Sequence, residues 1–410
     1  MKEIAILHYA GPPVVGGVEW TMEMHARLLT ERGYRVRIVA GRVGNFHPDV
    51  RSIQIPEIGS THKNVLSIGK ELAAGRVTKE FYALRDKIEQ KLRSALKGAD
   101  VCIAHNVTTL HKNMPLTAAL HDLVSSGEGP RLISWAHDFA WLDPIYTPAL
   151  HDGYPWDLLR RPWKGVEYVV VSGDRRKMLA GLFGWPEERI HVVSPGITPE
   201  SMLGISETGS RLAKELGLWE ADPCLLLPAR ITRRKNIELG IEVISEIAGE
   251  RPSAKLVVTG PPGPHNPSNV EYLRRLKGLR EDLGVRGNVV FMYELGDEES
   301  PFIPDERLMA ELYRICDALF FPSKREGFGI PILEAGVSRM QIFCSDIPPF
   351  RESGDGFVHT FGLNDSPAEV AKMIVSTLEG SDLYRMRKRV LEQYTWDSIV
   401  DGKIIPLIEG

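Results

Sequence analysis

The sequence predicts an α/β protein of two doubly wound domains, each with a parallel sheet between layers of helices. Short apolar or β-branched runs alternate along the whole chain with stretches of helical periodicity, which is the order expected of parallel strands joined by crossover helices. The runs are almost continuously hydrophobic, as strands buried on both faces are. A length of 410 residues also exceeds what one hydrophobic core usually serves, so two domains are expected.

Each predicted domain has its own series of strands. In the first half these are Ile4–His8, Val36–Val39, Val101–Ala104, Leu132–Trp135, Tyr168–Ser172 and His191–Val193. In the second half they are Leu225–Leu227, Leu256–Thr259, Val289–Met292, Ala318–Phe321 and Ile342–Cys344. Ile237, Ile241, Ile244 and Ile247 recur at helical spacing, which predicts an amphipathic helix covering the second sheet. A polar stretch follows His191–Val193, so we place the domains at 1–200 and 201–385.

The composition narrows the class of partner and the compartment. A formal net charge of −4 argues against a nucleic-acid partner, because such proteins use surplus basic residues to neutralise phosphates. The four cysteines lie in or beside apolar runs and form no Cys-x-x-Cys pair. We therefore expect buried thiols, no disulfide and no zinc site, as in a reducing cytoplasm. The apolar start is too short for a signal peptide, and no run reaches the ~20 residues of a membrane span.

Two glycines, Gly16 and Gly17, stand between the first predicted strand and a helix begun by Val18 and Met22. Backbone N–H groups at such a helix start can approach an anion, although glycines after a strand also form simple turns. The stretch lacks a Gly-x-Gly-x-x-Gly spacing, which argues against a nicotinamide or flavin cofactor.

The second half has two basic and two acidic residues near predicted strand ends. Arg230 and Lys235 follow Leu225–Leu227, and Glu326 and Glu334 enclose a Gly-Phe-Gly-Ile-Pro stretch in a Glu-x7-Glu spacing. Further motifs along the chain are Gly16-Gly17, Ala136-His137-Asp138, Pro195-Gly196-Ile197, Pro322-Ser323 and Tyr394-Thr395-Trp396. With all of these motifs, nearly the whole sequence resembles the retaining glycosyltransferases of family 4, also called group 1.

That family has the GT-B architecture, so the resemblance implies two Rossmann-like domains that face an interdomain cleft. It also implies a C-terminal helical segment, placed here at 386–410, that packs back on the first domain. The first domain would serve the acceptor, and the second would bind a nucleotide-sugar donor.

The resemblance also implies a role for each motif residue. Arg230 and Lys235 would stabilise the charge that develops on a nucleoside diphosphate leaving group, a task suited to a guanidinium and an ammonium. Glu334, in a helix expected to begin near Pro331, would accept hydrogen bonds from the ribose, and Glu326 would contact the transferred sugar. Phosphate would meet backbone N–H groups at two helix starts. These starts are at Gly16 and Gly17 and at Phe328, Gly329 and Ile330.

His137, Arg230, Lys235 and Glu326 form the predicted catalytic set. His137 follows a predicted strand, and in the resembling enzymes this position contacts the donor sugar; a lone histidine is otherwise more often a core residue. His105 and Asn106 also follow a strand and are candidates for the acceptor side. Arg233 and Arg234 are predicted to be plain surface charge.

Two segments leave questions open. Many family members continue the Pro-Gly-Ile turn with aspartate, but this chain has Thr198-Pro199-Glu200, which puts one acceptor-side or interdomain contact in doubt. The segment Lys63–Lys97 has nine basic and four acidic residues, hence a local charge of +5. It could meet an anionic membrane surface, although a solvated helix face with salt-bridge spacing explains it as well.

These observations predict a metal-independent retaining hexosyltransferase that uses a UDP- or GDP-sugar, no cofactor and no covalent side-chain nucleophile. The sequence has no Asp-x-Asp pair suited to a metal–diphosphate bridge. An epimerase or phosphorylase of the same fold, or an inactive sugar-nucleotide-binding subunit, are the alternatives. The sugar, the acceptor (a sugar, small molecule or lipid) and the oligomeric state stay open. We expect a cytoplasmic protein, with peripheral membrane contact as an option.

Overall fold

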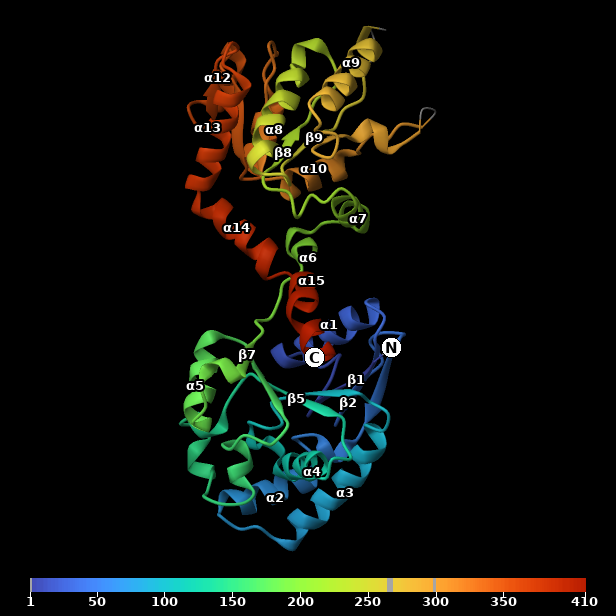
Figure 1. Ribbon diagram of the computed structural model, residues 1–410, viewed down its shortest axis with the longest axis vertical. Helices are drawn as coiled ribbons and strands as arrows, with labels where there is room; N and C mark the ends of the chain where they lie inside the picture. Colours follow the sequence, from blue (N-terminus) through green and yellow to red (C-terminus); the bar gives the residue numbers. More distant parts are fainter. Residues whose placement is uncertain (1, 264–267, 298–299) are drawn as a thin grey trace. The chain divides into compact units, whose positions relative to one another are not determined.

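A computed structural model describes residues 2–263, 268–297 and 300–410. The chain forms two compact units (Figure 1). Unit 1 comprises Met1–Ile197 and Trp396–Gly410, and unit 2 comprises Thr198–Thr395. The predicted ranges 201–385 and 386–410 therefore differ from these units near the C-terminus, where the chain returns at Trp396.

Unit 1 has, in its described residues, a seven-stranded parallel sheet in the order β3-β2-β1-β4-β5-β6-β7. The strands are β1 Glu3–His8, β2 Arg35–Ala40, β3 Val50–Gln54, β4 Val101–His105, β5 Arg131–Ala136, β6 Glu167–Val170 and β7 Ile190–Val192. The helices are α1 Gly17–Glu31, α2 Lys63–Ala73, α3 Lys79–Ala95, α4 Met114–Ser125, α5 Gly173–Phe183, α15 Trp396–Ile399 and α16 Ile405–Glu409.

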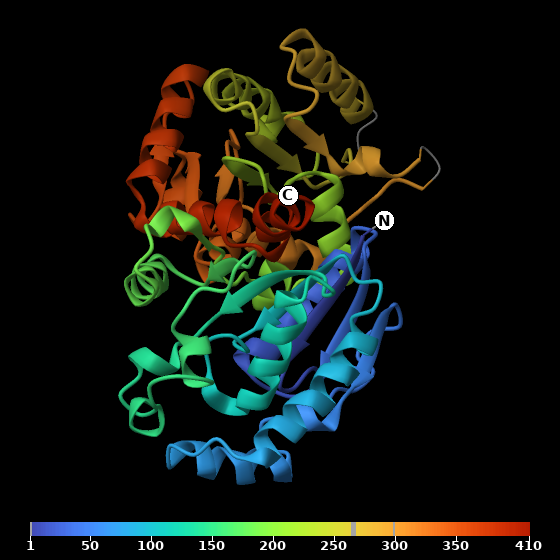
Figure 2. The same cartoon turned by 60° about the horizontal axis from the view of Figure 1, so that its bottom comes forward.

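The two faces of this sheet bury separate hydrophobic clusters. Along β1, Ala5 and Leu7 pack into one cluster with α2, α3 and α4, and Ile4 and Ile6 pack into the other with α1. Figure 2 shows α2 and α3, in blue, together on one side of the sheet. Because side chains alternate along a strand, the four consecutive apolar residues of β1, Ile4 to Leu7, are what a sheet covered on both faces requires.

The C-terminal segment completes the α1 face of unit 1. Trp396, Ile399 and Ile404 are buried in the same cluster as α1, and Figure 1 shows this segment beside that helix. The Trp396 N–H donates to the Ile197 carbonyl at 3.0 Å. A Cβ on Gly196 would lie 2.7 Å from Trp396 Cδ2, so this close approach requires glycine. The expected return of the C-terminal helix to the first domain is confirmed, and two of the sequence motifs meet at this point.

Unit 2 has, in its described residues, a six-stranded parallel sheet in the order β10-β9-β8-β11-β12-β13. The strands are β8 Cys224–Leu227, β9 Lys255–Val258, β10 Val289–Phe291, β11 Ala318–Phe321, β12 Gln341–Ser345 and β13 His359–Phe361. The helices are α6 Pro199–Leu203, α7 Glu207–Glu215, α8 Ile237–Glu250, α9 Ser268–Asp282, α10 Glu306–Ile315, α11 Ile330–Val337, α12 Pro348–Gly354, α13 Pro367–Gly380 and α14 Asp382–Gln393.

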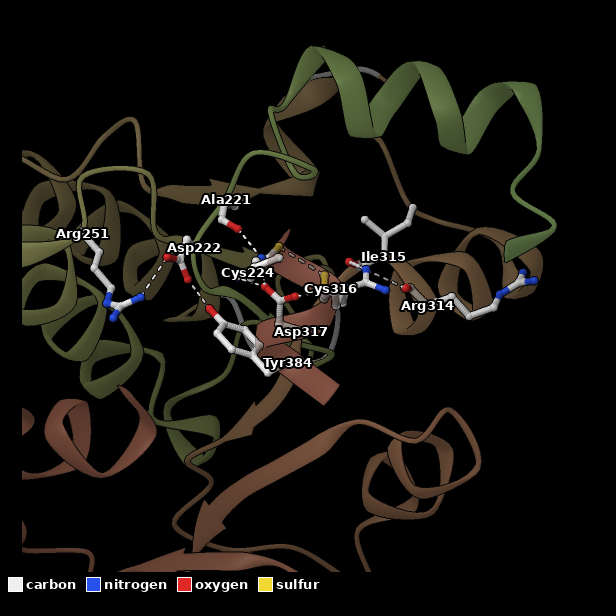
Figure 3. Close-up of polar contacts among 11 residues, drawn as sticks. Ala221, Asp222, Cys224, Arg251, Arg314, Ile315, Cys316, Asp317 and Tyr384 are labelled. Atoms are coloured by element: carbon white, nitrogen blue, oxygen red, sulfur yellow. Dashed lines mark hydrogen bonds and ion pairs between the residues drawn. The ribbon is translucent and has the colours of Figure 1, made fainter. Parts of the chain in front are cut away.

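The buried carboxylate of Asp317 joins α14 to the start of the second sheet (Figure 3). It accepts hydrogen bonds from the Cys224 N–H at 2.8 Å and from Lys388 Nζ at 2.5 Å. Lys388 also donates to the Ala221 carbonyl at 2.5 Å, and Tyr384 bonds to Asp222. Residues 386–393, which we assigned to the returning segment, are thus held within unit 2.

All eleven predicted strands are present, each within two residues of its expected ends. The amphipathic segment is also confirmed, because Ile237, Ile241, Ile244 and Ile247 are buried on α8. The prediction missed β3 and β13, which are both edge strands. All four cysteines lie in described residues and are buried free thiols, as expected.

Candidate functional site

The strand order of unit 2 places its predicted site residues at a topological switch point. From β8 the chain builds outward through β9 to β10, and then returns to place β11 on the other side of β8. In open α/β sheets, ligands bind beyond the carboxyl ends of the strands where the order reverses. Arg230 and Lys235 follow β8, and Glu326 follows β11, so all three lie at this point.

The loop after β8 is fixed by the loops after its two neighbouring strands. Ile231 donates its N–H to the Pro261 carbonyl at 2.9 Å, and Lys324 donates its N–H to the Arg234 carbonyl at 2.8 Å. A Cβ on Gly260 would lie 2.4 Å from the Ala229 carbonyl oxygen, so glycine is needed where the loops cross. Arg230 is exposed on this braced loop.

Glu326 is the centre of a charged cluster at the same edge. Its carboxylate forms ion pairs with Lys235 and, at 2.8 Å, with Arg234 Nη1, and it accepts a hydrogen bond from Ser323 Oγ at 2.8 Å. The Lys235 side chain is only 10% exposed, and its ammonium lies 4.7 Å from the centre of the Phe321 ring. Arg234 is exposed, as predicted, but it is also an ion-pair partner of Glu326, which the sequence did not indicate.

The titration of this cluster follows from burial and pairing. Burial alone would raise the pKa of Glu326, but the hydrogen bond and charge of Lys235 lower it overall. Burial lowers the pKa of Lys235, and the contact with Glu326 opposes that shift. We therefore expect an anionic carboxylate that holds the Lys235 ammonium in one place.

The helix start after Glu326 depends on one glycine. Gly329 has φ +98°, and an added Cβ would lie 2.8 Å from Phe350 Cε1. Gly329 precedes α11 directly, and Phe328 and Ile330 beside it are 43% and 61% exposed. The first N–H groups of a helix have no intrahelical acceptor, so this start can offer donors to an anion.

Glu334 lies on α11, as predicted, and is exposed. Its Oε2 accepts a hydrogen bond from the Tyr313 hydroxyl at 2.6 Å. Burial and the neighbouring Glu334 raise the pKa of Tyr313, so the phenol stays a donor. Tyr313 was not among the predicted site residues, and Ser323 was included only as part of the Pro322-Ser323 motif, without a role; the structure shows that these two hydroxyls orient the two glutamates.

Unit 1 has a matching switch point between β1 and β4. Gly16 and Gly17 lie at the start of α1 after β1, where Gly16 is the residue before the helix and has extended backbone. The Glu19 carboxylate lies against Gly16, because an added Cβ there would be 2.1 Å from Glu19 Oε2. An anion at this helix start would have to move the Glu19 side chain.

His137, directly after β5, is held by the last residue of β4, His105, and by Asn106, which follows it. Asn106 Oδ1 accepts the N–H of His137 at 2.7 Å and the N–H of Asp138 at 3.3 Å. His105 Nδ1 lies 3.1 Å from His137 Nε2. His105 is fully buried, so within unit 1 it supports His137 and does not line an open acceptor surface.

Burial keeps the histidines of this region neutral. It lowers the pKa of His137 to about 4 and that of His25 to about 3, in both cases with a smaller contribution from a neighbouring histidine. The pKa of His105 is lowered for the same reasons. Each ring therefore carries one N–H at neutral pH.

Two family models together match most of the chain. The model described as Glycosyltransferase Family 4 matches residues 15–201, and the model described as Glycosyl transferases group 1 matches residues 210–390. The chain belongs to the group 1 glycosyltransferases. The GT-B fold expected from the sequence is thereby confirmed, together with the activity class of glycosyl transfer.

Individual relatives of this glycosyltransferase are distant. A mannosylglucosylglycerate synthase of Thermotoga maritima is 25% identical, with 91% of each chain covered. A D-inositol 3-phosphate glycosyltransferase of Acidothermus cellulolyticus is 26% identical over 72% of this chain and 65% of its own. Among solved structures, a glycosyltransferase from Rickettsia africae aligns over 100% of this chain and 98% of its own, with 15% identity and a TM-score of 0.39.

The basic segment of this glycosyltransferase is partly neutralised. Within Lys63–Lys97, Lys87 and Lys91 both pair with Glu57, and Arg85 and Arg93 also form ion pairs. Membrane contact through this segment stays a prediction. Among the described residues, no helix combines the length and the apolar character needed to cross a bilayer.

Proposed function

We propose that this glycosyltransferase moves a hexose from a UDP- or GDP-sugar to a hydroxyl acceptor with retention of anomeric configuration, without a metal or a covalent side-chain nucleophile. The observation that supports it most is the cluster at the switch point of unit 2. There, Arg230, Lys235 and Glu326 come from loops that are hydrogen-bonded to one another.

The chemistry of the proposed reaction explains the two cations. When the bond between the sugar and the diphosphate breaks, negative charge grows on the diphosphate oxygens. A guanidinium and an ammonium that are already in place stabilise this charge without reorganising, and such preorganised stabilisation is usually the largest single contribution to catalysis. Glu326 holds the Lys235 ammonium for this purpose, and Arg230 is exposed to reach the ligand.

The proposal also assigns the contacts with the ribose, the phosphates and the transferred sugar. Glu334, oriented by Tyr313, accepts hydrogen bonds from the ribose, and N–H groups of Phe328, Gly329 and Ile330 bind phosphate. From unit 1, Gly16 and Gly17 supply further N–H groups, and His137 contacts the transferred sugar. Because a positioned cation pair would do the work of a metal, no cofactor is included in the proposal.

The named relatives favour transfer over the other chemistries of this fold. Both are named for joining or transferring sugars, and neither is named as an epimerase or phosphorylase. Their names contain small hydroxylated molecules, a glycerate and an inositol phosphate, so we propose a small polyhydroxylated acceptor first, with sugar and lipid acceptors as further candidates.

Turnover separates an active enzyme from an inactive sugar-nucleotide-binding subunit. Thermal shifts with a panel of UDP- and GDP-sugars identify the donor, because a ligand that binds only the folded state raises the melting temperature. Nucleoside diphosphate release is then measured with that donor, with and without EDTA. We expect slow hydrolysis that acceptor accelerates and EDTA leaves intact. Binding without any turnover would support the inactive subunit, and loss of turnover in EDTA that magnesium or manganese restores would refute metal independence.

A further inference from the structure

Four histidines cluster in the described part of unit 1, where the rings of His25 and His137 both contact the His105 ring and His8 contacts the His105 backbone. His8 Nδ1 lies 2.8 Å from the His105 carbonyl oxygen, and His105 Nδ1 lies 3.1 Å from His137 Nε2. The His105 and His137 rings are 5.4 Å apart at 30°, and the His25 ring lies 5.5 Å from His105. His105 is thus the central member of the cluster.

The contact between His105 and His137 can contain only one proton when both rings are neutral. If His105 bears it on Nδ1, His105 donates to His137 Nε2, and His137 has its own proton on Nδ1. If His137 is the donor, the proton of His105 is on Nε2. That nitrogen is fully buried and has no hydrogen-bond partner among the described residues.

The two arrangements differ in what they leave unpaired inside the protein. The second leaves a buried N–H without an acceptor, whereas the first leaves only a bare ring nitrogen. Buried N–H groups without partners are the rarer defect in folded proteins. The first arrangement is therefore favoured. It leaves His137 Nδ1–H, which has no partner within the described residues, free to donate.

We propose that His105 is a positioning residue that fixes His137 as the Nδ1–H tautomer, so that His137 donates this proton in a hydrogen bond to an oxygen of the transferred sugar. The contact with sugar rests on the proposed function, but the tautomer does not. His137 is then a hydrogen-bond donor and not a general base. Since Asn106 fixes the backbone of His137, two consecutive residues at the end of β4 hold both its backbone and its ring.

Other charged groups near the cluster do not reverse this assignment. From α1, Glu19 acts on His8 by raising its pKa, but burial lowers that pKa overall. Asp138, the neighbour of His137, is paired with Arg175 of α5 at 3.3 Å. Besides His137, the rings of His25 and Trp135 contact the His105 ring, and at neutral pH neither is charged.

The test is the tautomer of His137, read from imidazole ¹⁵N chemical shifts of the full-length protein in the absence of substrate. His137→Gln identifies the signals. We expect the Nδ1–H form in the parent, a shift towards Nε2–H in His105→Phe, and recovery in His105→Asn, whose amide can still donate. His25→Phe is the matched control, because it removes a ring that packs on His105 without a hydrogen bond to His137, and it should leave the tautomer unchanged.

Kinetics then separates this inference from the proposed function. We expect kcat of His105→Phe to fall about tenfold, the value of one hydrogen bond, with a smaller change in His105→Asn. A parent protein in the Nε2–H form, or the same tautomer in the parent and His105→Phe, would overturn the inference, and the parent spectrum alone decides if the variant does not fold. If the tautomer behaves as expected but His137→Gln transfers sugar at the parental rate, the assigned sugar contact fails and the positioning role stands.

Discussion

Replacing Gly329 with alanine tests the geometry of the helix start in unit 2. The added Cβ would lie 2.8 Å and 2.9 Å from two ring atoms of Phe350. Phe350 is fully buried and stacks on Phe321 with ring centres 5.0 Å apart, so its ring cannot move aside without disturbing the core. The residue would also have to adopt φ +98°, which L-residues rarely do.

The magnitude follows from these two effects. A side chain forced into a sparsely populated backbone region costs about 1–3 kcal/mol, and inserting a methyl group into packed surroundings costs about 1–3 kcal/mol. Because a shift of the loop can relieve part of both, we expect Gly329→Ala to destabilise unit 2 by about 2–4 kcal/mol. Gly327→Ala is the matched control, since its Cβ would meet nothing within 4 Å, and its effect should stay within about 0.5 kcal/mol.

Hydrogen exchange of peptides covering α11 and α12 measures this effect where it occurs, and it does not require the whole chain to unfold in one step. Nucleotide affinity should fall in parallel in Gly329→Ala, because the N–H groups assigned to phosphate belong to the same turn. Equal exchange protection in Gly329→Ala and Gly327→Ala would refute the reasoning from φ and the Phe350 contact.

Two further predictions concern the histidine cluster and the ribose contact. Because the pKa values of His25 and His137 are about 3 and about 4 in the folded chain, against an ordinary 6.5, the unfolded chain binds more protons below about pH 6.5. The stability of unit 1 should therefore fall as the pH drops from about 7 to about 4, a dependence that His25→Phe should flatten; urea midpoints that do not change over this range would contradict it. Glu334→Gln should weaken nucleotide binding by about 1–3 kcal/mol. Tyr313→Phe should weaken it by less, because it keeps the carboxylate and removes only the hydrogen bond that orients it. If titration calorimetry finds the nucleotide affinity of both variants equal to that of the parent, the ribose assignment is wrong.

The sequence predicted the central strands well because their burial on both faces leaves a continuous apolar run. The two missed strands, Val50–Gln54 and His359–Phe361, are at sheet edges and contain exposed or half-buried positions, so they lack that signal. Residues 386–393 were misplaced because the Lys388 contacts that hold α14 to unit 2 join distant parts of the chain.

The site residues also show that local sequence patterns do not reveal contacts between distant parts of the chain. Motifs located Arg230, Lys235, Glu326 and Glu334, but not their partners. Arg234 looked like ordinary loop charge, and only the fold brings it to Glu326. His105 was a candidate for the acceptor side because it follows a predicted strand. Its burial against His25 and Trp135 depends on helix packing that a local pattern does not contain.

The central claim, that Arg230 and Lys235 stabilise charge on the leaving group, is tested most directly by kcat at saturating donor in alanine variants of each. Arg230→Ala is the cleaner change, because Lys235→Ala also releases Glu326. Arg233→Ala is the control, since it removes an equal charge from the same loop and its guanidinium lies over the Tyr272 ring, 5.4 Å from its centre. We expect kcat to fall roughly 10²–10³-fold for Arg230→Ala and Lys235→Ala, with a smaller loss of donor affinity and little change for Arg233→Ala. Weak donor binding with parental kcat in both would contradict the claim, because it would mean that the pair binds ground state and transition state equally.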